Sequence, residues 1–225
     1  MLGVQLVWLK RDLRLRDHRP LVEACQRGPV IVLYVYEPEI YQQPEYDASH
    51  HVFLNACLGE LDRDLRARGG KVTFRHGEIT QVLNELTAEL RTRSGQRIER
   101  IWAHEEVGLR VSYQRDQRVA RWCRENGVDF RELPDHGVIR RLRSRDGWAA
   151  KWYARMKGQP LAPPETVPSL PTKNAPKVGR RFSAERLGLV TGARRAQDVQ
   201  RGGASEGEQT LATFLDSRGV NYRKE

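Results

Sequence analysis

The sequence predicts an α/β fold: a doubly wound, Rossmann-like parallel sheet of five strands, then an irregular proline-rich connector and a short C-terminal helix. Two observations predict this class. Short apolar segments alternate with segments of helical periodicity five times over residues 1–133. Several of the apolar segments are also continuous, as in strands buried on both faces. This alternation is typical of a parallel sheet covered by helices and joined by right-handed crossovers.

The predicted strands are the apolar segments, which are rich in β-branched and aromatic residues. They cover residues 5–9, 30–36, 71–75, 100–103 and 129–133. Between them, apolar side chains recur at helical spacing over residues 20–25, 49–68, 80–93 and 113–126. Pro20 suits a first helical turn, and Gly127 suits a helix end.

The character of the chain changes after about residue 135. Residues 160–176 contain six prolines, which favours an extended connector over the surface. Residues 206–215 have helical spacing again. We therefore divide the chain into an α/β domain (1–135), a connector (136–204) and the start of a further helical unit (205–225). Because a connector of this length is rarely free-standing, either the tail folds back on the α/β domain or a second domain is missing.

Composition narrows the class of protein. Lys and Arg number 39 against 29 Asp and Glu, a net charge of +10. This excess is typical of proteins that bind anionic partners, and equally of arginine-rich solvated helix faces. The cysteines lie far apart, so no metal-ligand spacing is present. With no apolar run long enough to span a membrane, we expect a soluble cytoplasmic protein with buried, reduced thiols.

The first strand leads into a charged segment, Lys-Arg-Asp-Leu-Arg, at residues 10–14. In a doubly wound sheet, ligands bind at the carboxyl ends of strands. Arg11 and Arg14 can therefore hold a phosphate or carboxylate, with Asp12 orienting either of them. The alternative is an Arg–Asp network that only fixes the loop. The segment has no glycine-rich loop, which argues against a dinucleotide fingerprint and a P-loop.

The segment Trp-Leu-Lys-Arg-Asp-Leu-Arg-Leu-Arg-Asp-His at residues 8–18 resembles the opening signature of the photolyase/cryptochrome family, Trp-Phe-Arg-x-Asp-Leu-Arg-x-x-Asp-Asn. Further similarities follow in order: a second strand closing in Glu37-Pro38, a Phe53-Leu54 helix, and a helix with Arg115-Asp116 and Val119. The resemblance covers about residues 3–135, and the first signature is its most specific part.

The resemblance implies a light-driven flavoprotein of two domains. In the family, the α/β domain carries an antenna chromophore (a folate, a deazaflavin or a flavin), and a helical domain carries FAD and binds damaged DNA. The chain would then be the N-terminal part of a deoxyribodipyrimidine photolyase, a carbon–carbon lyase that repairs pyrimidine dimers. We expect it to be inactive alone, because the catalytic FAD domain would be missing. The alternatives are a cryptochrome-type blue-light sensor and a stand-alone chromophore-binding α/β module without catalysis.

The resemblance also implies site residues. Arg11 and Glu37 would border the antenna crevice after the first two strands, and Glu105 and Glu106 after the fourth. A carboxylate there can accept hydrogen bonds from a pterin or deazaflavin ring edge. Many members have Asn or Asp, an aromatic residue and Pro after strand four, where this chain has Ala-His-Glu-Glu-Val-Gly at 103–108. The identity of the antenna therefore stays open, and two solvated loop carboxylates are an equal alternative.

Two segments beyond the domain also carry expectations. Residues 140–153 interleave cations with Trp148, Trp152 and Tyr153, a mixture that can bind nucleic acid. We favour packing of these aromatics against protein, because the family begins its interdomain connection here. Near the end, Tyr222 resembles a tyrosine that contacts the FAD phosphates. The rest of the FAD site would lie beyond the chain, in the same polypeptide or in a separate helical-domain polypeptide; we expect a monomer with no membrane partner.

Overall fold

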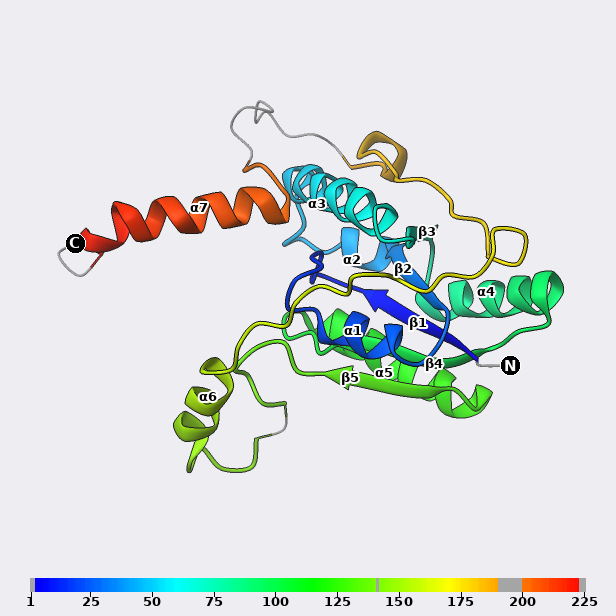
Figure 1. The fold of residues 1–225 in the computed structure, drawn as a ribbon, viewed down its shortest axis with the longest axis horizontal. Coiled ribbons are helices and arrows are strands. Elements are labelled where there is room, and N and C mark those ends of the chain that lie inside the picture. Colours follow the sequence, from blue (N-terminus) through cyan, green and yellow to red (C-terminus); the bar gives the residue numbers. More distant parts are fainter. Residues whose placement is uncertain (1–2, 141, 190–199, 223–225) are drawn as a thin grey trace.

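The computed structural model describes residues 3–140, 142–189 and 200–222. Its five strands form one sheet in the spatial order β3-β2-β1-β4-β5, and all neighbouring strands are parallel (Figure 1). The predicted fold class is confirmed. The strands are β1 (Val4–Leu9), β2 (Val30–Tyr36), β3 (Val72–His76), β4 (Ile98–His104) and β5 (Asp129–Leu133).

The helices alternate with the strands as the periodicity predicts. They are α1 (Arg19–Cys25), α2 (Pro38–Tyr41), α3 (Ala48–Arg66), α4 (Ile79–Ser94), α5 (Arg110–Asn126), α6 (Trp148–Met156) and α7 (Ala204–Asp216), with the 3-10 turns η1 (Glu185–Leu187) and η3 (Arg218–Asn221). Helices α2 and α6 were not expected from the sequence pattern.

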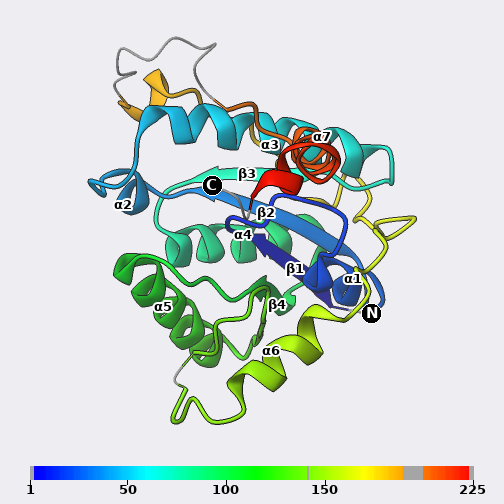
Figure 2. The same ribbon diagram turned by 90° about the vertical axis from the view of Figure 1, so that its left-hand side faces the viewer.

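Alternate side chains of the central strand enter two separate cores. Leu6 and Trp8 of β1 pack in a core with α4 and α5, whereas Val7 and Leu9 pack in a core with α1 and α3. Figure 2 shows α1 and α5 on opposite sides of the sheet. Because both faces of β1 are covered, every residue of this strand is buried. The residues that follow β1 in the candidate site are therefore attached to a strand that is fixed on both faces.

The connector runs back along the α/β domain. Val167 is 3% exposed, and its N–H donates to the carbonyl oxygen of Arg68 at 2.7 Å. Further on, the Phe74 N–H donates to the Val178 carbonyl oxygen at 2.7 Å. This bond satisfies a backbone donor on the edge strand β3, which would otherwise be free to pair with another chain.

The last helix, α7, projects from the body of the protein (Figure 1). Its beginning is held by Glu60 of α3, which accepts from the Ser205 N–H at 2.8 Å and the Ser205 hydroxyl at 2.7 Å, and the exposed Glu208 lies 3.9 Å from Arg16. Leu211 and Leu215 are 57% and 64% exposed. An exposed apolar stripe on a projecting helix is typical of a surface that packs against further protein.

Two further observations concern the cysteine thiols and the length and polarity of the helices. Cys57 and Cys123 are buried free thiols, whereas Cys25 is only partly buried. Within the described residues, the helices are too short or too polar to cross a membrane.

Candidate functional site

A cavity of about 600 Å³ opens at the carboxyl ends of β1 and β2. Leu9, Lys10 and Arg11 reach it from the end of β1, and Tyr34, Val35 and Glu37 from β2 and the residue after it. Its size suits a small-molecule ligand. Its place in the sheet is the one at which doubly wound folds bind ligands.

One side of the cavity lining is apolar and includes Leu54 and the aromatic residues Tyr34, Tyr41, Tyr46 and Phe53. Tyr41 of α2 lies 4.7 Å from Tyr46, ring centre to ring centre, and Phe53 lines the cavity at 37% exposure. Among the described residues, the buried hydroxyl of Tyr46 has no hydrogen-bond partner, whereas that of Tyr41 interacts with Tyr34. Burial raises the pKa of both phenols, so each remains a neutral O–H donor at neutral pH.

A network of buried ion pairs forms the inner polar wall. Its centre is Arg115 of α5, whose guanidinium donates to Glu37 at 2.9 Å, Glu106 at 2.6 Å and Asp116 at 2.9 Å. The Arg115 guanidinium also lies over the Trp8 ring, 4.8 Å from its centroid. We call the full set the buried ion network: Lys10, Glu37, Glu106, Arg115, Asp116, Glu132 and Arg140.

Glu37 has the least support of the carboxylates in this network. Its Oε1 accepts from Arg115, and among the described residues Arg115 is the cation that pairs with it. Burial raises the pKa of Glu37 to about 7, although the Arg115 charge and hydrogen bond act in the opposite direction. Because Glu37 lines the cavity, a ligand with an N–H or O–H group could donate a second hydrogen bond to it.

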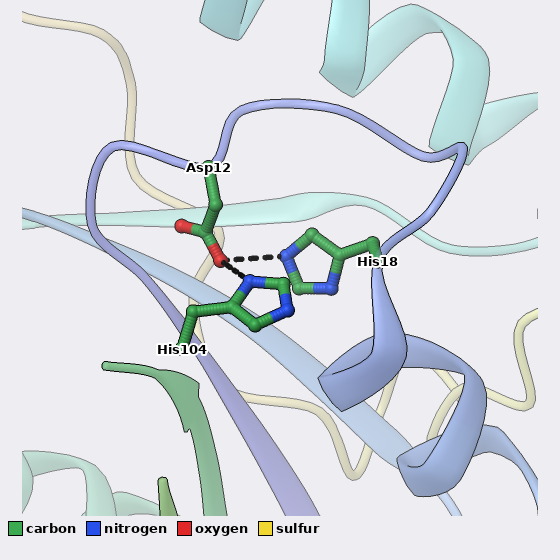
Figure 3. Close-up of side chains that lie close together, drawn as sticks. All are labelled: Asp12, His18 and His104. Atoms are coloured by element: carbon green, nitrogen blue, oxygen red, sulfur yellow. Dashed lines mark hydrogen bonds and ion pairs between the residues drawn. The ribbon is translucent and has the colours of Figure 1, made fainter. Parts of the chain in front are cut away.

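A second polar cluster joins Asp12, His18 and His104 beneath the loop after β1 (Figure 3). Oδ2 of Asp12 lies 2.6 Å from Nδ1 of His104 and 2.9 Å from Nε2 of His18. All three side chains are at most 5% exposed. Burial raises the pKa of Asp12, but the charges and hydrogen bonds of the two histidines prevail and hold it well below its usual range.

The tautomer of His18 decides what this cluster can do. His18 caps α1, and its Nδ1 accepts from the Leu21 N–H at 3.1 Å. A neutral His18 ring therefore carries its hydrogen on Nε2, the nitrogen that faces Asp12. A cation at this position would have to displace that hydrogen. Although Asp and His are common metal ligands, the arrangement joins the β1 loop to the end of β4 through short contacts of both histidines with Oδ2 of Asp12.

The structure places the predicted site residues in three different settings. Arg11, Glu37 and Glu106 line the cavity. Glu105 is not among the lining residues, and its N–H extends the β4–β5 pairing by donating to the Leu133 carbonyl oxygen at 2.8 Å. Tyr222 lies after η3, 75% exposed. Its ring centre lies 5.8 Å from that of Phe214.

Asp12 differs from the sequence analysis in its role. It was expected to orient Arg11 or Arg14, but it binds the two histidines and accepts from the Lys10 N–H at 2.9 Å. Arg14 pairs instead with Asp135 at 2.5 Å. The sequence analysis also missed Arg115, Tyr41 and Tyr46 as site residues. Of these three residues, only Arg115 had a signal in the sequence, as part of the Arg115-Asp116 pair in the family resemblance.

The basic aromatic segment has a mixed outcome. Trp148 and Trp152 of α6 are partly buried, and Nε1 of Trp148 donates to the Gly137 carbonyl oxygen at 3.2 Å. Tyr153 is 59% exposed. The packing interpretation thus fits the two tryptophans, while the tyrosine stays at the surface.

Comparisons with known proteins agree with this architecture. A family model described as DNA photolyase matches residues 5–164. A cryptochrome DASH from Gloeobacter violaceus is 31% identical over 91 residues, which are 38% of this chain and 18% of the relative.

Two solved structures share the fold. A class III photolyase from Agrobacterium tumefaciens matches with a TM-score of 0.73 at 21% identity, over 96% of this chain and 45% of its own. An archaeal photolyase from Sulfolobus tokodaii, solved with two FAD molecules, matches with a TM-score of 0.65 at 21% identity, over 92% and 46%. The chain spans less than half the length of each. Because the family model matches well over half of its residues, the chain belongs to the DNA photolyase family.

Proposed function

We propose that this chain is the α/β domain of a light-driven flavoprotein of the photolyase lineage, and that its cavity binds an antenna chromophore. The observation that carries the proposal is the cavity at the strand ends, with its aromatic wall and the buried hydroxyl of Tyr46, which has no hydrogen-bond partner among the described residues. A buried hydroxyl without a partner is costly, so this group favours a ligand that accepts hydrogen bonds. A bound folate, deazaflavin or flavin would absorb light and pass the excitation to FAD.

The residues of the cavity have separate roles in this proposal. The Tyr46 hydroxyl donates to a ring carbonyl or nitrogen atom of the chromophore, while Glu37 and Glu106 accept from its N–H groups. Arg11, with a side chain that is 64% exposed, binds an anionic substituent at the rim. Glu105 does not line the cavity, so the proposal gives it no contact with the chromophore.

The repair chemistry belongs to the whole protein. In this proposal residues 1–135 form the antenna domain, 136–204 the connector and 205–225 the start of the FAD-binding domain. The exposed apolar stripe of α7 would pack within that domain, and Tyr222 would contact the FAD phosphates there. The domain is supplied by the same polypeptide or a separate one, and damaged DNA is the substrate.

A second candidate is a cryptochrome-type light sensor. The similarity to a cryptochrome DASH favours it. The antenna cavity serves either function, so the same binding experiment tests both.

The experiment is a titration of the purified chain with riboflavin 5′-phosphate (FMN), 5,10-methenyltetrahydrofolate and a 5-deazaflavin, followed by absorbance and fluorescence anisotropy. We expect one of them to bind. Tyr46→Phe should weaken binding roughly 5- to 10-fold, the effect of one lost hydrogen bond of about 1 kcal/mol. Tyr36→Phe is the matched control, because the Tyr36 hydroxyl donates to Asn55 at 2.7 Å and does not line the cavity. Failure of all three compounds to bind would overturn the proposal.

A further inference from the structure

The connector forms a second hollow on the α/β domain, where it passes β3 (Figure 1). This groove has a volume of about 380 Å³. Its lining residues come from β3, α4 and the connector: Phe74, Arg75, Glu89, Lys177, Gly179, Arg180, Phe182 and Arg186. They share no member with the lining of the strand-end cavity. The groove is therefore a separate feature, and the proposed function gives it no role.

Arg75 and Glu89 fix the connector along one side of the groove. Arg75 donates to the Lys177 carbonyl oxygen at 2.7 Å and to Glu89 at 3.0 Å. The second carboxylate oxygen of Glu89 accepts from the Lys177 N–H at 2.6 Å. Gly179 then passes so close to β3 that a Cβ would meet the Phe74 carbonyl oxygen at 2.3 Å. The side chains that follow on the connector therefore start from a fixed backbone.

The groove has an excess of positive charge. Four of its lining side chains are cationic and one, Glu89, is acidic. Arg75 pairs with Glu89, so these two charges cancel. Among the described residues, no carboxylate lies within ion-pair distance of Lys177, Arg180 or Arg186. All three side chains belong to exposed residues. Three cations therefore remain without compensation at the surface.

Acidic residues near the groove do not supply the missing charge. Glu185 of η1 is fully exposed and its carboxylate accepts a hydrogen bond from Ser183, while Glu85 of α4 does not line the groove. The basic surface instead continues along the connector. Arg93 of α4 donates to the connector backbone at 2.7 Å, and Lys173 is exposed. An extended row of cations is complementary to an extended polyanion.

The aromatic residues of the groove are already covered. Phe74 is 5% exposed. The Phe182 ring has the Arg186 guanidinium 4.3 Å from its centroid and stacks with the His76 ring at 5.2 Å. Protein partners usually insert apolar or aromatic anchors into pockets at the centre of an interface, and these two rings form no such pocket. Phosphate groups need only exposed cations, and guanidinium groups match their geometry. The groove thus favours phosphate over an acidic protein.

We infer that the groove binds the phosphate backbone of nucleic acid, so that the α/β domain contacts DNA through its own surface. Lys177, Arg180 and Arg186 each neutralise a phosphate. Because the contact is with the backbone, it carries no preference for base sequence or for a lesion. The inference goes beyond the proposed function and uses no residue of the strand-end cavity.

The number of phosphates determines the salt dependence of binding. For duplex DNA, the logarithm of the binding constant falls with the logarithm of the salt concentration, with a slope of about −0.9 for each phosphate neutralised. Three contacts therefore contribute a slope of about −2.7, which is a loss of affinity of roughly 40-fold between about 50 and 200 mM salt. We expect the unaltered chain to lose at least this much.

The experiment is a titration of the purified chain into an undamaged, fluorescein-labelled DNA duplex in the dark, followed by fluorescence anisotropy at several salt concentrations. The groove variant combines Lys177→Gln, Arg180→Gln and Arg186→Gln. Its slope should be shallower than that of the unaltered chain by about 2.7, or about 0.9 for each cation removed. The backbone contacts of the connector are retained, and circular dichroism checks that the variant is folded.

The matched control removes the same charge from another surface. It combines Arg110→Gln, Arg121→Gln and Arg124→Gln, three exposed positions on α5 that do not line the groove. This variant should keep the salt slope of the unaltered chain. Equal slopes for the groove variant and the α5 variant would overturn the inference, because the binding would then follow net charge alone.

Two measurements use the unaltered chain, so they decide the question even if the groove variant does not fold. A salt slope clearly shallower than about −2.7 would overturn the inference. Poly-L-glutamate that competes as well as unlabelled duplex at equal charge concentration would overturn it too, because the surface would then not distinguish phosphate from carboxylate. Chromophore binding is expected to be unchanged in the groove variant, so the antenna proposal and this one stand or fall separately.

Discussion

Replacement of Arg115 by Met tests the energetics of the buried ion network. Met keeps the hydrophobic contact over the Trp8 ring, where the guanidinium lies 4.8 Å from the centroid, but removes the charge. Glu37, Glu106 and Asp116 then each lose a partner within 3 Å. Breaking a buried ion pair on one side costs about 3–5 kcal/mol, because the remaining charge stays desolvated. We expect a loss of that size at pH 7.

The matched control is Arg118→Met, one helical turn further along α5. The Arg118 side chain is 36% exposed and pairs with Glu39 and Glu78. Solvent-screened pairs of this kind contribute at most about 1 kcal/mol. The two variants remove the same charge from the same helix, so their difference isolates the effect of burial.

Urea unfolding at pH 8 and pH 5, followed by circular dichroism, measures both variants. At about 2–4 °C per kcal/mol for a chain of this size, the Arg115→Met midpoint should also fall by roughly 6–20 °C in a thermal scan. Its deficit should shrink at pH 5, because carboxylates that have lost their cation take up protons more readily. A loss no larger than that of Arg118→Met, or one independent of pH, would refute the reasoning.

Three further changes test other parts of the structure. Asp12→Asn should destabilise the protein at pH 7, and the difference in stability from the unaltered chain should close only below about pH 4. The two histidines hold the pKa of Asp12 well below its usual range in the folded state, so its ionised carboxylate adds stability that is lost as pH falls through that pKa. Urea unfolding at pH 7 and pH 3 measures this difference. Gly179→Ala should cost about 1–3 kcal/mol, since φ is +72° and a Cβ would meet the Phe74 carbonyl oxygen at 2.3 Å, whereas Gly207→Ala, in open space on α7, should stabilise slightly in the same unfolding assay. Cys123, whose pKa burial raises to about 12, should react with iodoacetamide at pH 8 only after unfolding in urea, as mass spectrometry of the labelled peptides will show.

Most of the α/β core could be predicted from residue types alone. The continuous apolar run at 30–36 has the same bounds as β2. Every residue of this strand is buried, so the change from apolar to polar residues marks both of its ends. Gly127 ends α5 in the left-handed conformation, with φ of 64°, as expected for a glycine after the last periodic residue. Local chemistry determines these features, so the sequence reveals them.

The elements that the sequence analysis missed have weak local patterns. The short helix α2, Pro38–Tyr41, has only four residues, too few for a hydrophobic period. Helix α6 buries no residue, so it has no apolar stripe facing a core. Both are held by their surroundings, and a sequence pattern records only what the segment itself contributes.

The candidate site likewise contains residues that the sequence predicts and contacts that it does not. Arg11 and Glu37 follow strands directly, so their place at the sheet edge is predictable once the strands are known. The contact between Arg115 and Glu37 joins residues 78 positions apart, and that between His104 and Asp12 joins residues 92 apart. Such pairings depend on the crossover geometry of the whole sheet, and one sequence alone does not specify them.

The two polar clusters are joined through the end of β1, so the loop that borders the cavity is held from two sides. The Lys10 N–H donates to Asp12 at 2.9 Å, while its ammonium donates to Asp116 at 2.9 Å. The strand end is therefore fixed by the histidine cluster on one side and the ion network on the other. A strand end held from both sides presents Lys10 and Arg11 to the cavity at fixed positions before any ligand enters.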